Sequence, residues 1–180
     1  DQTVTVRDFR AGEVNRVDST RTDPGGKGVN VASILADYGV SVAVTGFLGE
    51  ENDQIFRHLF EQKEIDDRFV RIAGRTRTGI KVVDPLRQHT TDINFPGEAP
   101  SSADLEQLVA VLDGLVTECD WFVFSGSLPA GVPVFLYRDL LQRVRGKHVA
   151  LDTSGEAFRQ AITAAPTVIK PNVEELGQYL

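Results

Sequence analysis

The sequence predicts an α/β fold: a parallel sheet with helices on both faces, accompanied by a small second β-sheet. Two observations predict it. From residue 40 onward, short apolar runs alternate with amphipathic runs of helical spacing, which is the pattern of βαβ units. Residues 3–22 and 69–95 interrupt that rhythm with polar–apolar alternation, which indicates a smaller sheet packed over one edge of the main one.

The first elements are predicted in the N-terminal third. TVTV at residues 3–6 is expected to pair with VNRVDST at residues 14–20 as antiparallel strands. A helix is expected after the glycines, with Gly39 at its C-cap. Its apolar positions at helical spacing are Val31, Ile34, Leu35 and Tyr38. A buried strand is expected at residues 40–49. The helix after it carries Ile55, Leu59 and Phe60 on one face.

The rest of the chain continues the alternation. Residues 69–95 are expected to form a hairpin that is interrupted at DPLRQHT. Ser101 is placed to cap a helix with apolar residues at helical spacing. The strands expected beyond it are 121–127, 148–154 and 167–172, and the helices are 135–144, 156–162 and 173–180.

Composition excludes several classes of partner. A net charge of −7 argues against nucleic acid or an anionic membrane as the main partner. The single cysteine, Cys119, leaves no internal disulfide and fits a reducing cytoplasm. No apolar run approaches the roughly 18 residues of a membrane span. The chain opens on Asp1 without a methionine and stops within a helical run, so we expect it to be truncated at both ends.

Small and polar residues follow four of the predicted core strands. The segments are GFLGEEND, SGSLPAG, DTSGE and KPNVEE. One such turn means little, because turns favour these residues in any case. Ligands of open α/β sheets bind beyond the carboxyl ends of the strands, so four such ends together indicate one extended ligand crevice.

The stretch DPGGKGVNVA at residues 23–32 places glycines and one lysine before a helix. It is not a Walker A loop, because Gly28 follows Lys27, and it fails the dinucleotide fingerprint at Val31. Glycines still let a ligand approach the backbone, and a helix start favours anionic or oxygen-rich groups. The alternative is a simple turn whose lysine is solvated.

The stretch from Pro24 to Asp53, together with SGSLPAG, LDTSGEAF and IKPNVEEL, resembles the PfkB family of ribokinase-like carbohydrate kinases. The resemblance covers essentially all 180 residues and is closest to the phosphosugar branch. It implies a partial ribokinase-like domain over residues 1–180. In that domain the segments at about 3–22 and 69–95 form a β lid, and residues 23–68 and 96–180 form the α/β core.

The resemblance also implies an activity, which is ATP-dependent phosphorylation of a sugar phosphate. The expected substrate is fructose 1-phosphate, which would give fructose 1,6-bisphosphate. Tagatose 6-phosphate and fructose 6-phosphate are alternatives within the family. A regulatory protein that binds a sugar without catalysis is the alternative from another class. The implied partners are small molecules and a second copy of the chain, joined through the lid, rather than nucleic acid or a membrane.

Individual residues receive roles from the same resemblance. The positions implied to contact the substrate are Asp1, Gly25, Gly26, Lys27, Asn30, Arg77 and Ser127. Arg77 is expected to reach the substrate's phosphate, and Lys27 can face it. Lys170 and Asn172 lie where the family's nucleotide site begins. Asn172 and Glu175 match a motif that organises Mg²⁺ through water, with Asp152 as a helper.

Two features depart from the family pattern. The Gly-Ala-Gly-Asp motif, which carries the catalytic Asp base, is absent, and we expect it beyond Leu180. The second departure is Gly79, where relatives often have Asn, so the sequence does not indicate how this strand would hold a sugar.

Overall fold

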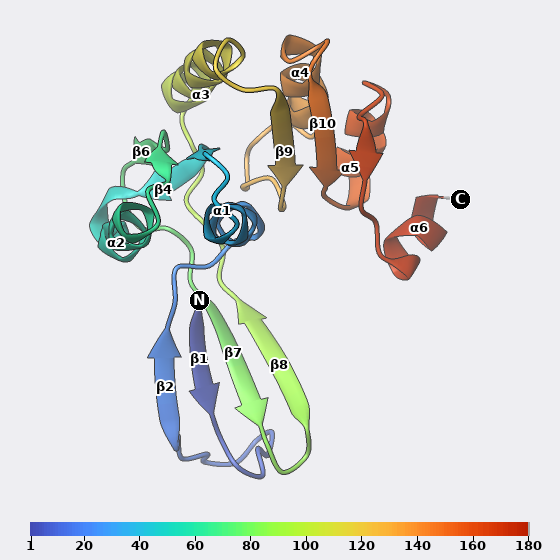
Figure 1. Cartoon of the computed structure of the whole chain (residues 1–180). Coiled ribbons are helices and arrows are strands. Elements are labelled where there is room, and N and C mark those ends of the chain that lie inside the picture. The colour runs from blue at the N-terminus through green and yellow to red at the C-terminus, as the bar shows by residue number, and fades with distance from the viewer. Residues whose placement is uncertain (180) are drawn as a thin grey trace.

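The computed structural model describes residues 1–179 and confirms the α/β class. Its strands form a four-stranded sheet and three smaller parallel groups, and the helices surround only the parallel groups (Figure 1). No helix within residues 1–179 is both long enough and apolar enough to cross a membrane.

The four-stranded sheet extends away from the helices (Figure 1). Its order is β2 (Ser19–Thr22), β1 (Gln2–Thr5), β7 (Gly79–Asp84) and β8 (His89–Asn94). β1 pairs antiparallel with β2 and parallel with β7, and β7 and β8 form an antiparallel hairpin that places Gly79 opposite Asn94. The ends of these strands nearest the core therefore bring Gln2, Thr22, Gly79 and Asn94 to one junction.

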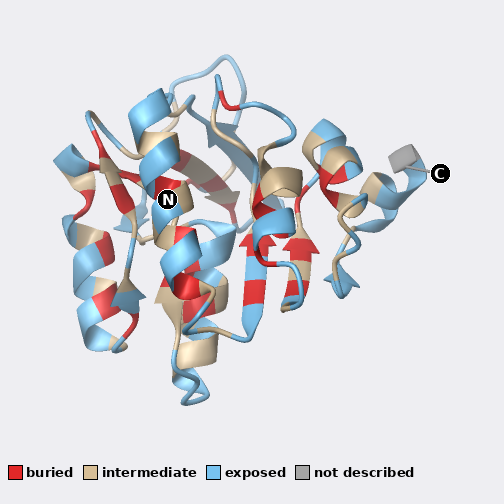
Figure 2. Cartoon of the chain, turned by 90° about the horizontal axis from the view of Figure 1, so that it is seen from above, coloured by how far each residue is buried: buried red, intermediate tan, exposed pale blue. Residues whose placement is uncertain are grey.

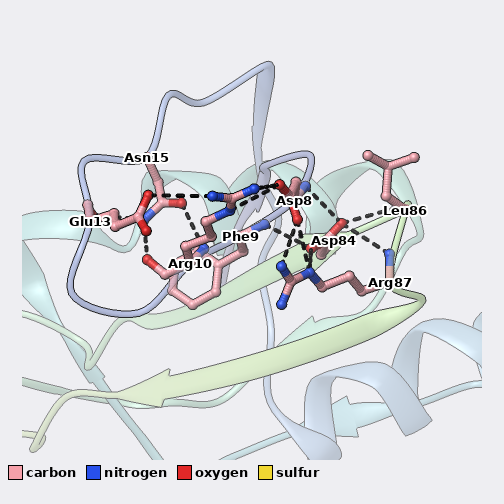
Figure 3. A network of polar contacts seen from close by, with 8 residues as sticks. All are labelled: Asp8, Phe9, Arg10, Glu13, Asn15, Asp84, Leu86 and Arg87. Atoms are coloured by element: carbon pink, nitrogen blue, oxygen red, sulfur yellow. Dashed lines mark hydrogen bonds and ion pairs between the residues drawn. The ribbon is translucent and has the colours of Figure 1, made fainter.

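Asp84 ties the far end of this sheet together (Figure 3). Its buried carboxylate accepts backbone N–H bonds from Phe9 at 2.8 Å and from Leu86 at 3.0 Å, and also from Asp8 and Arg87. Burial alone would raise the pKa of Asp84, but these donors outweigh it and hold the pKa below its ordinary value. One carboxylate thus fixes the connection between β1 and β2 against the β7–β8 turn.

The core strands are all parallel. β3 (Ala43–Val44) pairs with β5 (Asp66–Asp67), and β4 (Phe47–Gly49) pairs with β6 (Val70–Ile72). A third group has the order β11 (Val168–Ile169), β10 (His148–Asp152), β9 (Trp121–Ser125). The predicted strand at 40–49 is divided into β3 and β4 at Gly46, whose φ of +138° suits glycine alone.

Helices and one short 3₁₀ turn connect these strands. They are α1 (Lys27–Asp37), η1 (Glu50–Asn52), α2 (Gln54–Gln62), α3 (Ser102–Leu115), α4 (Leu136–Arg143), α5 (Gly155–Ile162) and α6 (Val173–Tyr179). The predicted cap of α3 is confirmed, because Ser101 and Asp104 form a reciprocal capping box. That box satisfies two of the N–H groups that a helix start leaves without partners.

Each face of the parallel strands has its own apolar core. Val44 and Leu48 contact the buried residues of α1 and α2, including Phe60. Their neighbours Ala43 and Phe47 point the other way and pack with α3, α4 and α5. Because strand side chains alternate, each of these strands contributes to both layers. Figure 2 shows buried residues both on the strands and on the helices around them. The prediction of helices on both faces is confirmed.

Three sequence expectations need correction. Val70–Ile72 pairs with β4 in the core and is not part of the small sheet. Arg71 lies there between two buried residues, and the carboxylates of Asp53 and Asp67 neutralise its charge. Residues 14–18 are not a strand, and pairing begins only at Ser19. In α1 the buried positions are Val29 and Ala32, whereas Ile34 and Tyr38 are exposed.

Candidate functional site

A cavity of about 420 Å³ lies where the four-stranded sheet meets the core. Its lining residues are Asp1, Gln2, Thr22, Asp23, Asn52, Gln54, Ile55, Phe56, Arg75, Thr76, Arg77 and Thr78. They come from the strand ends at the junction, from η1 and α2, and from the segment that precedes β7. The wall thus combines two carboxylates with two guanidinium groups, a donor and acceptor set suited to a small, hydroxylated anion.

The carboxylate of Asp1 lies directly against two glycines. A Cβ atom built on Gly25 would lie 2.5 Å from Asp1 Oδ2, and one built on Gly79 would lie 2.9 Å from Asp1 Oδ1. The Oδ1 atom of Asn94 is also 3.2 Å from the Gly79 position. Glycine at both places therefore leaves room for Asp1. The departure at Gly79 has a structural account, because Asp1 and Asn94 on the neighbouring strand together occupy the space that a larger side chain would need.

Helix α1 starts at the glycine turn. Gly26 is its N-cap residue with a φ of +117°, which only glycine adopts without strain, and no atom lies within 4 Å of the place a Cβ would occupy. Gly26 O accepts the bond from Asn30 N–H at 2.9 Å. The helix start therefore faces open space, as a ligand that contacts the backbone would require.

Lys27 and Lys170 converge on one carboxylate. Lys27 Nζ lies 2.9 Å from Asp152 Oδ1, and Lys170 Nζ lies 3.2 Å from Asp152 Oδ2. Asp152 is largely buried at the end of β10, and burial would raise its pKa, but the two ammonium groups lower it below the ordinary value. The sequence analysis assigned Lys27 to the substrate site and Lys170 to the nucleotide site, and the structure brings both to the same carboxylate.

Hydrogen bonds hold the end of β9 beside that cluster. The Tyr137 hydroxyl donates to Ser125 O at 3.1 Å and to Gly126 O at 3.2 Å, and Thr153 Oγ1 also donates to Gly126 O. Burial and the nearby Asp152 carboxylate raise the pKa of Tyr137 to about 12, so it remains a donor at physiological pH. Ser127 follows this fixed segment and is exposed.

Arg77 is exposed, and its stem lies against Gly97, where an added Cβ would be 3.4 Å from Arg77 Cβ. It forms no ion pair with any residue in the described range 1–179. Its neighbour Arg75 lies 3.7 Å from Glu51 at the surface. An arginine that lines a cavity without a carboxylate partner is available to an anionic ligand.

Asn172 and Glu175 bond to each other. Asn172 N–H donates to Glu175 Oε2 and Glu175 N–H donates to Asn172 Oδ1, both at 2.8 Å, which is a capping box at the start of α6. Within residues 1–179, no three His, Cys, Asp or Glu side chains are grouped as a metal cage. Glu175 keeps its second carboxylate oxygen outside this pair of bonds.

The structure brings the predicted residues into two groups. Asp1, Gly25 and Arg77 belong to the cavity, and Lys27, Asp152 and Lys170 form the cluster at the strand ends. Asn30 and Ser127 are exposed, and neither side chain is hydrogen-bonded to a residue of either group in the described chain. Sequence reasoning missed four residues at the junction: Asp23, Asn52, Arg75 and Asn94. The signal for Asn94 was its register opposite Gly79, which only strand pairing reveals.

Comparison with known proteins gives a consistent result. The model of the pfkB family carbohydrate kinases matches residues 1–180. A 1-phosphofructokinase of Rhodobacter capsulatus is 51% identical, over 100% of this chain and 58% of its own length. One of Vibrio cholerae is 41% identical, over 99% of this chain and 57% of its own. A Thermotoga maritima structure, described as a possible 1-phosphofructokinase, has a TM-score of 0.87 at 28% identity and covers 96% of this chain and 57% of its own. The chain thus spans less than two thirds of these relatives.

Proposed function

The chain belongs to the pfkB family of carbohydrate kinases, and from that premise we propose that the whole protein transfers a phosphoryl group from ATP to a sugar phosphate. The proposed substrate is fructose 1-phosphate and the product fructose 1,6-bisphosphate, with fructose 6-phosphate and tagatose 6-phosphate as the competing substrates. In this reaction the acceptor hydroxyl oxygen forms a bond to the γ-phosphorus, the bond to ADP breaks, and the hydroxyl proton passes to a base that we expect beyond Leu180.

The main support for this proposal is the cavity at the junction. Asp1 offers carboxylate oxygens to sugar hydroxyls, Gly25 leaves room for that carboxylate, and the open space at Gly26 lets a sugar approach the start of α1. Arg77 lines the same cavity without a carboxylate partner in the described chain, and its guanidinium can donate hydrogen bonds to the phosphate that the sugar already carries. An unphosphorylated sugar would leave that guanidinium without a partner.

The cluster at the strand ends is proposed to serve the transferred group. Phosphoryl transfer needs positioning and charge neutralisation more than covalent assistance. Lys27 and Lys170 lie on either side of Asp152 and can offset the charge where substrate and nucleotide meet. Mg²⁺ would neutralise the nucleotide phosphates when bound. Asn172 and Glu175 would hold it through water, with Asp152 nearby.

The four-stranded sheet is proposed to act as a lid. It meets the core at the junction beside the cavity (Figure 1), and in the closed enzyme it would exclude water that would otherwise accept the phosphoryl group. The strand β2 is exposed at every position, and Val14 and Val17 in the connection before it are exposed as well. These surfaces support a homodimer joined through the lid, and the single Cys119 supports a cytoplasmic protein.

An ADP-release assay on the full-length protein tests the proposal. Fructose 1-phosphate, fructose 6-phosphate and tagatose 6-phosphate are offered with MgATP, beside fructose and a nucleoside as unphosphorylated controls. We expect turnover of fructose 1-phosphate above the other two. Turnover of only an unphosphorylated compound would contradict the assignment, and tight sugar-phosphate binding without ADP release would favour a regulatory protein.

A further inference from the structure

The side chain of Asn52 bonds both backbone groups of one residue next to Arg77. Asn52 Oδ1 accepts the N–H of Thr76 at 2.7 Å, and Asn52 Nδ2 donates to the carbonyl of Thr76 at 3.0 Å. A paired donor and acceptor of this kind fixes the orientation of the peptide as well as its position. Asn52 lies in η1, and Thr76 lies in the segment before β7, so the contact joins residues 24 positions apart in sequence.

The same turn holds the segment at two further points. Gly49 N–H donates to Thr76 Oγ1 at 2.8 Å, and Glu51 N–H donates to Gly74 O at 3.0 Å. A methyl group on Gly49 would overlap backbone atoms of Arg75 and Thr76. The segment therefore lies in direct backbone contact with the turn, and no side chain separates them.

The turn is itself anchored in the core. Asp53, next to Asn52, is buried and accepts from Arg57 Nε at 2.7 Å and from Arg71 Nε at 2.8 Å. Arg71 continues to Asp67 and to the carbonyl of Phe69, which fastens the turn to β6. The contact from Asn52 thus connects this anchored turn to the segment before β7 that carries the cavity arginines.

We propose that Asn52 is a positioning residue that holds Arg77 at the cavity for the phosphate of the substrate, an inference that rests on the proposed function. Arg77 has no carboxylate partner within residues 1–179 to fix its place, so its backbone must do so. Asparagine suits this role because its amide offers one donor and one acceptor. Aspartate would offer no donor to the Thr76 carbonyl, and alanine would offer neither.

A double-mutant cycle in the full-length protein tests the role. Asn52→Ala is expected to weaken fructose 1-phosphate binding about tenfold while MgATP affinity stays within about twofold. In an Arg77→Ala background the same change should cost less than about twofold, because the group that it positions is already absent. Asn52→Asp keeps the acceptor for the Thr76 N–H, but its second carboxylate oxygen would lie against the Thr76 carbonyl oxygen and repel it, so it should weaken binding at least as much as Asn52→Ala.

Asn15 provides a matched control. Its amide makes the same reciprocal pair of bonds to the backbone of Arg10, at 2.9 Å and 2.8 Å, in the connection between β1 and β2 at the far end of the sheet (Figure 3). Asn15→Ala therefore removes an equivalent contact away from the cavity. We expect its effect on binding, whatever its size, to be additive with that of Arg77→Ala.

Amide hydrogen exchange separates this inference from the proposed function. The Thr76 N–H should be protected in the wild-type protein, exposed in Asn52→Ala and still protected in Asn15→Ala. Fast exchange of Thr76 in the wild type would overturn the contact itself. Protected exchange combined with additive losses in the Asn52–Arg77 cycle would overturn the positioning role. A wild-type protein that binds no sugar phosphate would instead overturn the proposed function, and with it the role assigned to Arg77, whereas the exchange data would still decide on the contact.

Discussion

Arg77 at the cavity and the two lysines at the strand ends are positioned in different ways. Arg77 is held through its backbone, by the contact between Asn52 and Thr76, and its guanidinium has no carboxylate partner in the described chain. Lys27 and Lys170 are held through their charged ends, which share Asp152. One cation is thus available before any ligand arrives, whereas the other two already have a counter-charge.

This difference indicates different tasks. A phosphate that approaches Arg77 displaces only water, so binding retains most of the charge-assisted hydrogen bond. A phosphate that approaches Lys27 must compete with a carboxylate 2.9 Å away. For the proposed reaction, we therefore propose that the permanent phosphate of the sugar binds Arg77 and that the lysine cluster offsets the transient charge of the transferred group.

Among the tests of this difference, removal of Arg77 is expected to have the largest effect on activity. Arg77→Ala is expected to lower kcat/KM for fructose 1-phosphate about 10- to 100-fold, because a charge-assisted contact is lost, with little change in MgATP affinity. Arg77→Lys should recover only part of the loss, since an ammonium lacks the planar fork. Steady-state kinetics with each substrate varied in turn measure both effects. Equal losses for sugar phosphate and nucleotide would contradict the separate tasks.

Gly25 tests the carboxylate at the other end of the cavity. Gly25→Ala places a methyl group 2.5 Å from Asp1 Oδ2 and should rotate that side chain away, which weakens sugar-phosphate binding about tenfold. Stability should change by less than about 1 kcal/mol, because the displaced group is the end of a flexible side chain. Gly114→Ala in α3, with no atom within 4 Å, is the control. It should stabilise the protein by about 0.5–1 kcal/mol and leave binding unchanged. Tight binding by Gly25→Ala would remove Asp1 from the site.

Asp152→Asn addresses the lysine cluster. The amide no longer fixes the two ammonium groups and no longer helps to hold Mg²⁺, so the KM for MgATP should rise about threefold to tenfold, with a smaller change for fructose 1-phosphate. The stability loss should be about 0.5–1 kcal/mol, since both lysine side chains are largely solvated. Titrations with each substrate and thermal unfolding measure the two effects. A loss confined to the sugar phosphate would reverse the assignment of the two regions.

The smallest effect on substrate kinetics is expected far from both regions, at Asp84. Its pKa is lowered in the folded protein, so its contribution to stability is present above about pH 4 and is lost as the pH falls through the folded pKa. Asp84→Asn should reduce stability at pH 7 and flatten the pH dependence below about pH 4. Asp92→Asn, which removes an exposed carboxylate from β8 of the same sheet, is the control. Identical slopes for wild type and Asp84→Asn, from urea unfolding at several pH values, would contradict this account.

Periodicity and capping residues predicted much of the fold. The helix after Ser101 and the hairpin within residues 69–95 follow from local patterns, and the structure confirms both. The place of Val70–Ile72 could not be predicted in this way, because Arg71 resembles a solvent-facing residue until Asp53 and Asp67 are brought beside it. Alternation shows that a strand has two faces, but it does not show which sheet the strand joins.

The site was predictable only where a family motif reached it. Lys27 and Asp152 were both named from the sequence, but their contact spans 125 positions and no spacing rule predicts it. Asn52 was missed for a related reason. Its partner is the backbone of Thr76, and a residue that binds backbone leaves no complementary side chain in the sequence to indicate the pairing.

A crystal structure of the full-length protein with fructose 1-phosphate tests the division of tasks most directly. We predict that the phosphate oxygens lie within hydrogen-bond distance of the Arg77 guanidinium and that sugar hydroxyls contact the Asp1 carboxylate. The contact between Lys27 and Asp152 should remain in place. A phosphate bound between Lys27 and Lys170, with Asp152 displaced and Arg77 in solvent, would contradict the account.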